Sequence, residues 1–560
     1  MPKGDMCKSV LSAVLAMGIV TSAQAGKPER HAPGSTSVEA GQLTYYATAG
    51  DTLISIAQKL TTSVNNWHEL GMLNHVGNDR RIPIGTAIAI PANLLPDEPS
   101  EATVSAFSGQ VTLTPVKGAP GVAAIGSKIA EGGEVATGPN SFVTFVLPDG
   151  SHISLPSNSR VKLNVLRMAR FTKSPRTEVM LEDGDVESRV SPLGENKGRY
   201  EVHSLLATAG VRGTHFRVAK VGSGIANEVL GGVVAVGTPV KPASLDLTAG
   251  KGNIVDASGV GKPVPLLAAP ELLAGYALQE RTVVQFNVAD LAGAVSYHGQ
   301  IALDAQAQNI VAEVHSQGSK LKVDGLPDGD YFLRLSAIDK LGLEGLPRIV
   351  PFKLKARPVP PFSSLPKAKV RAERVEFAWT EAPDASSYHL QVARDAVFHD
   401  MVIDQPQVVG LQFVGDKLVP GKYWWRTASV SEHEGKPDHG PFGDAQAFEL
   451  FEPQKLGPIG DQGGNEFSFS WPFEPGQKFL VQIGRDAAFK SLLLDKQTDQ
   501  AEVHMPRPPA GTYYVRVQAT DPDGYVGAFT AAQKFTIHSR LSAGSGDAVR
   551  AGDSEVRSAD

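Results

Sequence analysis

The chain has a single cysteine and, after its first 25 residues, no long apolar run. Its 560 residues include one cysteine, Cys7, and aromatic residues make up 7% of the total. Because we expect Cys7 to be removed with a leader, the mature chain forms no disulfide and offers no cysteine nucleophile. No later stretch approaches the roughly 20 consecutive apolar residues that span a bilayer. We therefore expect domains that are held together by burial alone.

The net charge and the composition limit the possible partners and the fold class of the chain. The net charge is -6, and no basic run interleaved with aromatic residues is found, so nucleic acid is not expected as a partner. With 57 Gly and 39 Pro, the composition favours short strands separated by turns over long helices. A chain of this length is too long for one core, and the sequence therefore predicts a multidomain, mainly β protein.

The first 25 residues have the three-part plan of a secretory signal. Lys3 and Lys8 precede the apolar run Val10 to Val20, and Ala23-Gln24-Ala25 follows it. We expect export and cleavage near Ala25, and a periplasmic, cell-surface or secreted mature chain. Residues 26–41 read as a linker and residues 539–560 as a disordered tail.

Residues 42–95 have the pattern of a small α+β unit. A short strand, Leu43 to Ala47, leads to Gly50-Asp51-Thr52, where Asp51 or Thr52 can cap a helix with apolar residues at helical spacing. Ser63 is placed to cap a second short helix, and alternating isoleucines close the unit. The order is strand, helix, helix, strand.

These residues resemble the LysM module, a family that binds glycans containing N-acetylglucosamine, such as peptidoglycan. The similarity is carried by Gly50-Asp51-Thr52-Leu53, Ile56-Ala57, Leu73-Asn74 and the segment from Ile84 to Pro91. The resemblance implies a shallow sugar groove between two loops. It places Gly50, Asp51, Thr52 and Leu53 on one side and Asp79, Arg80, Arg81 and Ile82 on the other. The first loop matches the family motif residue by residue, and the second matches by position.

Residues 104–267 alternate apolar strands with tight turns and predict an all-β domain. Pro148-Asp149-Gly150 and Asp183-Gly184-Asp185 each read as a hairpin turn between two strands. These turns, Ala207-Thr208-Ala209 and the run from Val211 to Phe216 resemble the FecR domain, whose best-known members relay iron-siderophore signals to a sigma factor. Those members carry a cytoplasmic domain and a membrane span, and in their place we expect a cleavable signal here.

Arg212, Gly213 and Thr214 lie at the centre of that resemblance. A Gly within a strand run indicates a bulge or a close backbone approach, and the flanking side chains can satisfy buried backbone groups. The alternative is a partner-binding edge, and both interpretations stay open on the sequence alone.

From about residue 270 the chain repeats. Tyr297, Tyr388 and Phe479 are each 91 residues apart (388 minus 297, 479 minus 388). A Gly-x-Tyr motif follows in each copy, at Tyr331 and at two later tyrosines. A period near 90 residues with several short strands suits a β-sandwich array. The copies, at 270–356, 357–452 and 453–538, resemble fibronectin type III or immunoglobulin-like domains.

The sequence contains no complete catalytic or metal-binding motif among the patterns considered below. There is no Gly-x-Ser-x-Gly elbow and no complete dinucleotide fingerprint. His433-Glu434 with His439 is the nearest approach to a metal cluster, and it lies in a Gly, Pro and Lys loop. We expect no enzyme, no cofactor and no metal.

The favoured hypothesis is a non-enzymatic envelope protein that binds peptidoglycan through residues 42–95 and presents the other domains as scaffold or partner-binding surfaces. A FecR-type signalling component that contacts a membrane receptor or sensor is the alternative. A cell-wall hydrolase with an unrecognised site is the third hypothesis.

Overall fold

The chain forms a mainly β, multidomain structure in a computed structural model. The structure describes residues 31–39, 42–192, 198–211, 213–242, 245–459, 465–539, 549–551 and 554–555. By internal contacts it divides into two compact units. Unit 1 comprises Met1–Ala268, Gln308–Val311 and Ile338–Leu346, and unit 2 comprises Ala269–Ala307, Ala312–Ala337 and Pro347–Asp560. The predicted signal segment and most of the predicted tail lie outside the described residues.

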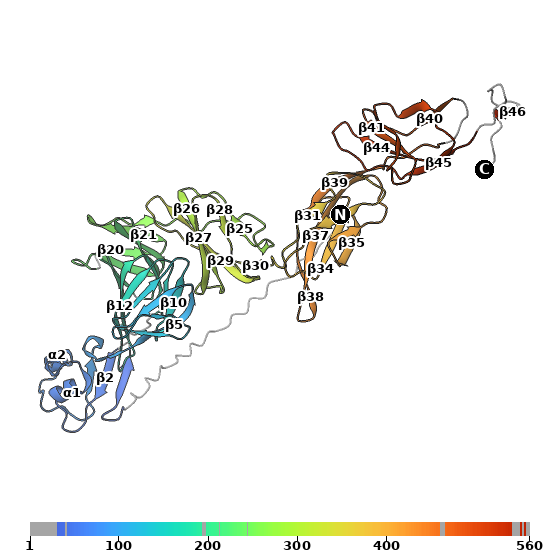
Figure 1. The fold of residues 1–560 in the computed structure, drawn as a ribbon. Coiled ribbons are helices and arrows are strands. Elements are labelled where there is room, and N and C mark those ends of the chain that lie inside the picture. The colour runs from blue at the N-terminus through green and yellow to red at the C-terminus, as the bar shows by residue number, and fades with distance from the viewer. Residues whose placement is uncertain are drawn as a thin grey trace, which may run out of the picture. The chain divides into compact units, whose positions relative to one another are not determined.

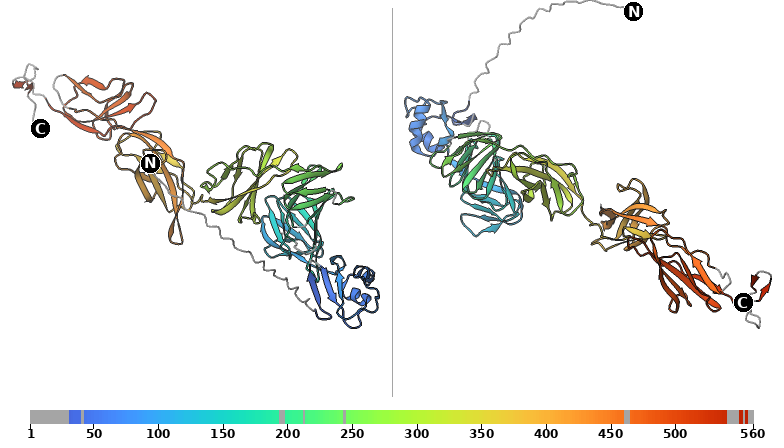
Figure 2. Two further views of the ribbon diagram at one scale, coloured as in Figure 1. Left: turned by 180° about the vertical axis from the view of Figure 1, so that it is seen from behind. Right: turned by 90° about the horizontal axis from the view of Figure 1, so that it is seen from above.

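Unit 1 begins with a small α+β module, in which two short helices lie beside a three-stranded antiparallel sheet of order β1-β2-β3 (Figures 1 and 2). Its elements are β1 (Thr36–Glu39), β2 (Gln42–Tyr46), α1 (Leu53–Leu60), η1 (Val64–Asn66), α2 (Trp67–Leu73), β3 (Ala87–Ile90) and η2 (Ala92–Leu94). Leu43, Ile56 and Ile88 are buried in its core. The strand β1 lies within residues 26–41, the stretch expected to be a linker. This part of the stretch is a strand because it pairs with β2.

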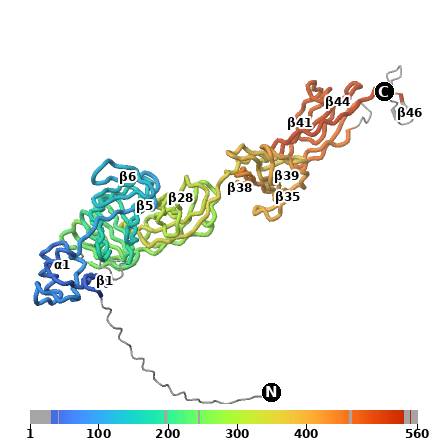
Figure 3. Tube along the Cα trace, turned by 90° about the horizontal axis from the view of Figure 1, so that it is seen from below, coloured from blue at the N-terminus to red at the C-terminus, as the bar shows by residue number. Residues whose placement is uncertain are grey.

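The rest of unit 1 is a sandwich of two ten-stranded sheets, and Figure 3 shows two of its strands, β5 and β6, together with α1 of the module. One sheet has the order β22-β21-β18-β17-β14-β11-β10-β5-β8, with β23 beside β21; the other has the order β20-β19-β16-β15-β13-β12-β9-β6-β7, with β4 beside β12. One core cluster draws apolar residues from both sheets. The strands are β4 (Asp97–Pro99), β5 (Glu101–Ser108), β6 (Val111–Thr114), β7 (Gly121–Val122), β8 (Lys128–Ala130), β9 (Glu134–Thr137), β10 (Phe142–Val146), β11 (His152–Leu155), β12 (Arg160–Ala169), β13 (Pro175–Asp183), β14 (Asp185–Arg189), β15 (Arg199–His203), β16 (Thr208–Val211), β17 (His215–Val221), β18 (Gly224–Gly231), β19 (Val233–Gly237), β20 (Leu245–Thr248), β21 (Lys251–Asp256), β22 (Gly259–Val260) and β23 (Val264–Pro265).

Of the two hairpins predicted here, one is confirmed and one is wrong. The strands β10 and β11 pair as an antiparallel hairpin across Gly150. The strands β13 and β14, by contrast, belong to different sheets: β13 pairs with β12 and β15, and β14 with β11 and β17. Gly184 makes this corner, with φ +72°, and a Cβ there would come within 2.6 Å of the Asn158 carbonyl oxygen. A glycine is therefore required where the chain crosses between the sheets.

Unit 2 contains β-sandwiches in tandem. The first has strands β24 (Leu278–Gln279), β25 (Val284–Asn287), β26 (Ala294–Ala302), β27 (Ile310–Ser316), β28 (Lys320–Val323), β29 (Gly329–Asp339) and β30 (Arg348–Leu354). The second has β31 (Ser363–Leu365), β32 (Lys369–Arg371), β33 (Glu376–Trp379), β34 (Ser387–Ala393), β35 (Met401–Val408), β36 (Gln412–Val414), β37 (Gly421–His433), β38 (Lys436–Phe442) and β39 (Gln446–Phe451). The third has β40 (Glu466–Ser470), β41 (Lys478–Gly484), β42 (Leu492–Thr498), β43 (Glu502–Pro506), β44 (Gly511–Thr520) and β45 (Gln533–Ile537); the short pair β46 (Arg550–Ala551) and β47 (Ser554–Glu555) follows.

The repeated Gly-x-Tyr motif has a structural cause. The hydroxyls of Tyr331, Tyr423 and Tyr513 each donate to the carbonyl oxygen four residues upstream, at 2.8, 2.6 and 2.9 Å. This is the tyrosine corner of immunoglobulin-like sandwiches, which fixes the entry of the chain into a central strand.

Among the described residues, no helix is both long enough and apolar enough to cross a membrane.

Candidate functional site

The first predicted loop of the module is shaped by the start of α1. The Thr52 hydroxyl accepts from the Ser55 N–H at 3.0 Å, and the Ser55 hydroxyl accepts from the Thr52 N–H at 2.9 Å. This reciprocal capping box satisfies two N–H groups that the helix leaves unpaired. Gly50 has φ +85°, a conformation that glycine adopts without strain. The loop geometry is thus fixed by local sequence.

Asp51 is used inside the module. One of its carboxylate oxygens accepts from the Tyr45 hydroxyl at 2.8 Å, from the Thr48 N–H at 2.7 Å and from the Thr48 hydroxyl at 2.9 Å. Burial alone would raise the pKa of Asp51, but these hydrogen bonds, with the Lys59 charge, lower it below its ordinary value. The carboxylate is therefore ionised and holds the loop in place.

The second predicted loop is tied to the first by one backbone hydrogen bond. The Leu53 N–H donates to the Asp79 carbonyl at 3.0 Å. Within the second loop, the Arg80 N–H donates to the Asn78 side-chain oxygen at 3.1 Å, and the Arg81 N–H to the Asn78 carbonyl at 3.3 Å. The structure thus brings the two predicted loops together and orders both.

The eight residues predicted to bind glycan differ in exposure. Leu53 and Ile82 are buried in the module core; Asp51, Thr52 and Asp79 are half-buried; Gly50, Arg80 and Arg81 are exposed. A ligand at these loops would therefore contact exposed backbone and the two arginine side chains, while Leu53 and Ile82 support the loops from below.

Two apolar residues beside these loops were missed in the sequence analysis as site residues. Ile54, in the first turn of α1, is 41% exposed, and Ile84, in the turn before β3, is 62% exposed. The signal was available, because Ile54 falls off the helical spacing of the core residues. Exposed aliphatic side chains next to ordered polar backbone offer a surface that suits the apolar face of a sugar ring.

The module meets the rest of unit 1 through other residues. Phe171, from the turn after β12, packs against the module core. A cleft of about 560 Å³ is lined by Gln42, Leu73 and Asn93 of the module and by Arg176 and Arg199 of the β-sandwich. The residues of the two predicted loops do not line this cleft.

Two of the predicted partner-binding residues, Gly213 and Thr214, lie in the turn between β16 and β17. Arg212 is outside the described residues. Gly213 has φ +66°, and a Cβ there would lie 3.0 Å from the Pro192 Cα atom. Thr214 is buried; its hydroxyl donates to the Val233 carbonyl at 3.0 Å, and its carbonyl accepts from the Val190 N–H. These contacts give Gly213 and Thr214 a structural role in the turn.

A buried ion network in unit 1 lies on β17 and β18. Arg217 donates to Glu228 at 2.7 Å and to the Glu344 carboxylate at 2.8 Å, and its remaining donors reach the carbonyls of Glu344 and Gly345. The Glu344 N–H donates in turn to the Glu228 carboxylate at 2.6 Å. We call Arg217, Glu228 and Glu344 the arginine clip. It holds the 338–346 segment, where Leu343 packs against Ala226.

Two carboxylates share one guanidinium in the arginine clip. Burial raises the pKa of Glu228, and the neighbouring Glu344 charge raises it further, against the attraction of Arg217. The attraction of Glu228 and Glu344 raises the pKa of Arg217, so this side chain stays charged. Sequence analysis missed the clip because Arg217 and Glu344 are 127 residues apart.

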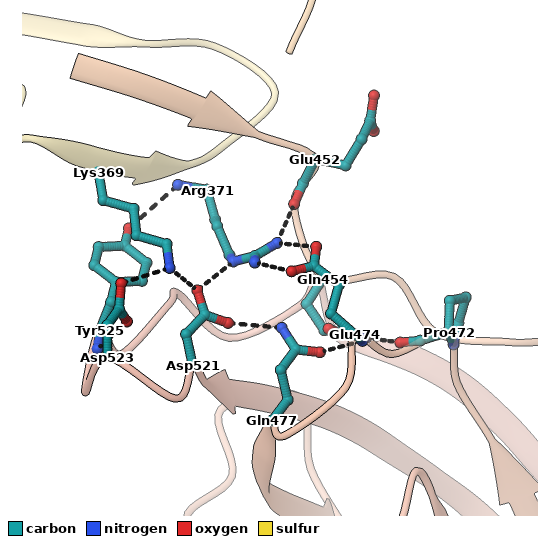
Figure 4. A network of polar contacts seen from close by, with 10 residues as sticks. All are labelled: Lys369, Arg371, Glu452, Gln454, Pro472, Glu474, Gln477, Asp521, Asp523 and Tyr525. Atoms are coloured by element: carbon teal, nitrogen blue, oxygen red, sulfur yellow. Dashed lines mark hydrogen bonds and ion pairs between the residues drawn. The ribbon is translucent and has the colours of Figure 1, made fainter. Parts of the chain in front are cut away.

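A second polar network lies in unit 2 (Figure 4). Arg371 of β32 donates to Asp521 at 2.9 Å and to both Glu474 oxygens, at 2.9 and 2.6 Å. Lys369 and Gln477 also contact the Asp521 carboxylate, at 2.6 and 2.7 Å. Burial alone would raise the pKa of Asp521, but Gln477, Lys369 and Arg371 lower it to about 2. Asp521 lies in a turn after β44, where its carbonyl accepts from the Gly524 N–H at 2.9 Å, and its side chain joins the second and third sandwiches.

Comparison with known proteins identifies one segment. Residues 133–235 match the family model described as FecR protein. The resemblance to FecR is therefore confirmed over these residues, which make up less than half of the chain. The resemblance of residues 42–95 to LysM stays a prediction. No curated protein matches the chain.

Among solved structures, three matches illustrate the similarity. A candidate anti-sigma factor from Parabacteroides distasonis is 21% identical, with 23% of this chain and 57% of that chain covered and a TM-score of 0.19. The chain thus spans less than two thirds of that structure. The FN1–FN3 domains of chicken CNTN1 are 12% identical, with 48% and 98% covered and a TM-score of 0.19. The fibronectin(III)-like modules of Clostridium thermocellum CbhA are 13% identical, with 33% and 94% covered and a TM-score of 0.15.

Proposed function

We propose that this chain is an exported, non-enzymatic protein of the cell envelope that binds peptidoglycan, or another glycan containing N-acetylglucosamine, through residues 42–95. The FecR region and the β-sandwiches then serve as scaffold or partner-binding surfaces. We place the mature chain in the periplasm or at the cell surface.

The observation that carries this proposal is the pair of loops at 50–53 and 79–82. They are joined by the hydrogen bond from the Leu53 N–H to the Asp79 carbonyl, and they expose Gly50 and Arg80. The exposed Ile54 and Ile84 supply apolar surface beside them. Fixed polar backbone next to apolar side chains is the combination that sugar recognition uses, and ordered loops avoid the entropy cost of folding around a ligand.

Sedimentation with purified sacculi tests the proposal. We expect the full mature chain to pellet with sacculi, and the double variant Ile54→Gln, Ile84→Gln to bind at least about 10-fold more weakly, which corresponds to about 1.4 kcal/mol. Met72→Gln is the matched control, because Met72 is an exposed apolar residue of the same module, 73% exposed on α2. A wild-type chain that stays in the supernatant would contradict the proposal.

The FecR match favours a second candidate function, an envelope signalling component that contacts a membrane receptor or sensor. It is motivated by residues 133–235 alone. Crosslinking from an exposed position next to the Gly213 turn should then recover a partner with a membrane span. Recovery of sacculus fragments without any such protein would leave the scaffold role as the better account.

The non-enzymatic part of the proposal has its own test. Zymography on peptidoglycan with the full mature chain should give no clearing. A cleared band that persists in the Ile54→Gln, Ile84→Gln variant would indicate a hydrolase with a site elsewhere in the chain.

A further inference from the structure

Three metal-ligating side chains meet on one face of the first sandwich in unit 2. His298 lies on β26, and Glu313 and His315 lie on the neighbouring strand β27. Residues 313 and 315 are two apart on a strand, so their side chains share a face. One ligand atom from each of the three residues lies within 4.8 Å of the other two. The topology therefore places two imidazoles and one carboxylate together.

The contacts within this group are close. His298 Nε2 is 3.3 Å from a Glu313 oxygen, and the His298 and His315 rings stack with centroids 4.1 Å apart and an interplanar angle of 9°. His298 is buried, the Glu313 side chain is 10% exposed, and His315 is exposed. The group is thus supported from inside the sheet and reachable from solvent through His315.

The equivalent positions of the second sandwich show which of these contacts belong to the repeat and which are specific to the first sandwich. The pair His298 and Glu313 recurs 91 residues later as His389 and Asp404 (389 minus 298, 404 minus 313), with Nε2 2.6 Å from the Asp404 carboxylate. The pair alone is therefore a feature of the repeat. His315 has no such counterpart, because the corresponding residue is Pro406.

The third sandwich completes the comparison. Its corresponding residues are Leu480, Asp495 and Gln497, each a further 91 residues on (480 minus 389, 495 minus 404, 497 minus 406). The carboxylate is kept and both imidazoles are absent. At these aligned positions, two histidines and one carboxylate occur together in the first sandwich alone.

We propose that His298, Glu313 and His315 form a binding site for a divalent transition-metal ion, with Zn²⁺ as the best match. Two imidazoles and one carboxylate are the ligand set of open zinc sites, in which water takes the fourth position. Zinc bonds of about 2.0–2.1 Å in a tetrahedron place ligand atoms about 3.4 Å apart, so a pair at the 4.8 Å limit must close by about 1.4 Å.

The ring stacking specifies the movement that binding needs. In two nearly parallel imidazoles the nitrogen lone pairs lie in separate, nearly parallel planes, so they cannot both point at one ion. One ring must turn, and His315 is the side chain that can do so because it is exposed. Metal binding therefore converts a stacked pair into two converging ligands.

Equilibrium dialysis of the untagged full mature chain against ZnCl₂, with elemental analysis, tests the proposal. We expect one equivalent of zinc, and a ligand-field absorption band when Co²⁺ replaces it. His315→Gln should weaken binding at least about 10-fold, the smaller effect seen even when an outer-shell partner is lost. His389→Gln is the matched control and should bind as the wild type does.

A gain-of-function variant completes the test. Asp404→Glu with Pro406→His builds the same three residues on the second sandwich and should raise the stoichiometry to two equivalents. Absence of zinc from the dialysed wild type would overturn the proposal, and so would zinc retained at full affinity by His315→Gln. Unchanged circular dichroism spectra establish that each variant is folded.

Discussion

Replacing Arg217 with methionine should release the 338–346 segment from unit 1. The Arg217 side chain is 8% exposed and the Glu228 side chain 2% exposed. Arg217→Met keeps the length of the aliphatic stem but leaves Glu228 and Glu344 without their cation. Removing one partner of a buried ion pair costs about 3–5 kcal/mol, whereas an exposed pair contributes about 0–1 kcal/mol. The loss of stability should therefore be large, and it should be confined to the 338–346 segment and its contacts.

Hydrogen exchange with mass spectrometry on the full chain measures this effect segment by segment. A loss of about 3 kcal/mol corresponds to more than 100-fold faster exchange at the Glu344 amide, which donates to Glu228 in the intact clip. Arg199→Met is the control, because Arg199 pairs with Glu201 but its side chain is 57% exposed. We expect no change at residues 338–346 in that variant.

The arginine clip also predicts a direction of pH dependence. The folded state raises the pKa of Glu228 above its ordinary value of 4.5, so it binds a proton that the unfolded state releases. This contribution to stability is full below pH 4.5 and is lost as the pH rises through the folded-state value. Protection of residues 338–346 should fall between pH 5 and pH 8, after correction for intrinsic exchange, and should not do so in Glu228→Gln. For the Arg217→Met experiment, protection of residues 338–346 within threefold of wild type would refute the role given to the arginine clip.

Two further predictions concern other parts of the chain. Thr52→Ala removes the α1 cap and should cost the module about 1 kcal/mol, seen as about fivefold faster exchange of the α1 amides; an unchanged rate would mean that the capping box is dispensable. Arg371→Met leaves Asp521 buried, and it should lower the melting temperature of the third sandwich. Because the pKa of Asp521 is lowered to about 2, its contribution is present above pH 3.8 and lost as the pH falls toward 2, so Arg371→Met should unfold at a higher pH on acidification. Acid unfolding at the same pH as wild type would contradict the role given to this network.

The features that sequence predicted best are those set by neighbouring residues. The Thr52 cap follows from three or four consecutive residues. The spacing of Tyr297, Tyr388 and Phe479 revealed the repeat because each copy buries an aromatic ring at this equivalent position. Glycine marks a turn, but the turn does not say which sheet the next strand joins. Gly184 therefore predicted a hairpin where the chain crosses between sheets.

The features that sequence could not predict join residues far apart in the chain. Arg217 and Glu344 meet across 127 residues, and Arg371 and Asp521 across 150. No local pattern marks such pairs, because their partners are decided by how the strands are ordered. The histidine group is hidden from the sequence for a related reason: His433 and His439 are close in the chain, whereas His298 and His315 are brought together by neighbouring strands.

The polypeptide passes between the two units more than once, after residues 268, 307, 311, 337 and 346. A force applied to the chain after residue 346 would therefore act first on a segment of unit 1, residues 338–346. To peel residues 338–346 away, such a force would have to draw Glu344 off a buried guanidinium.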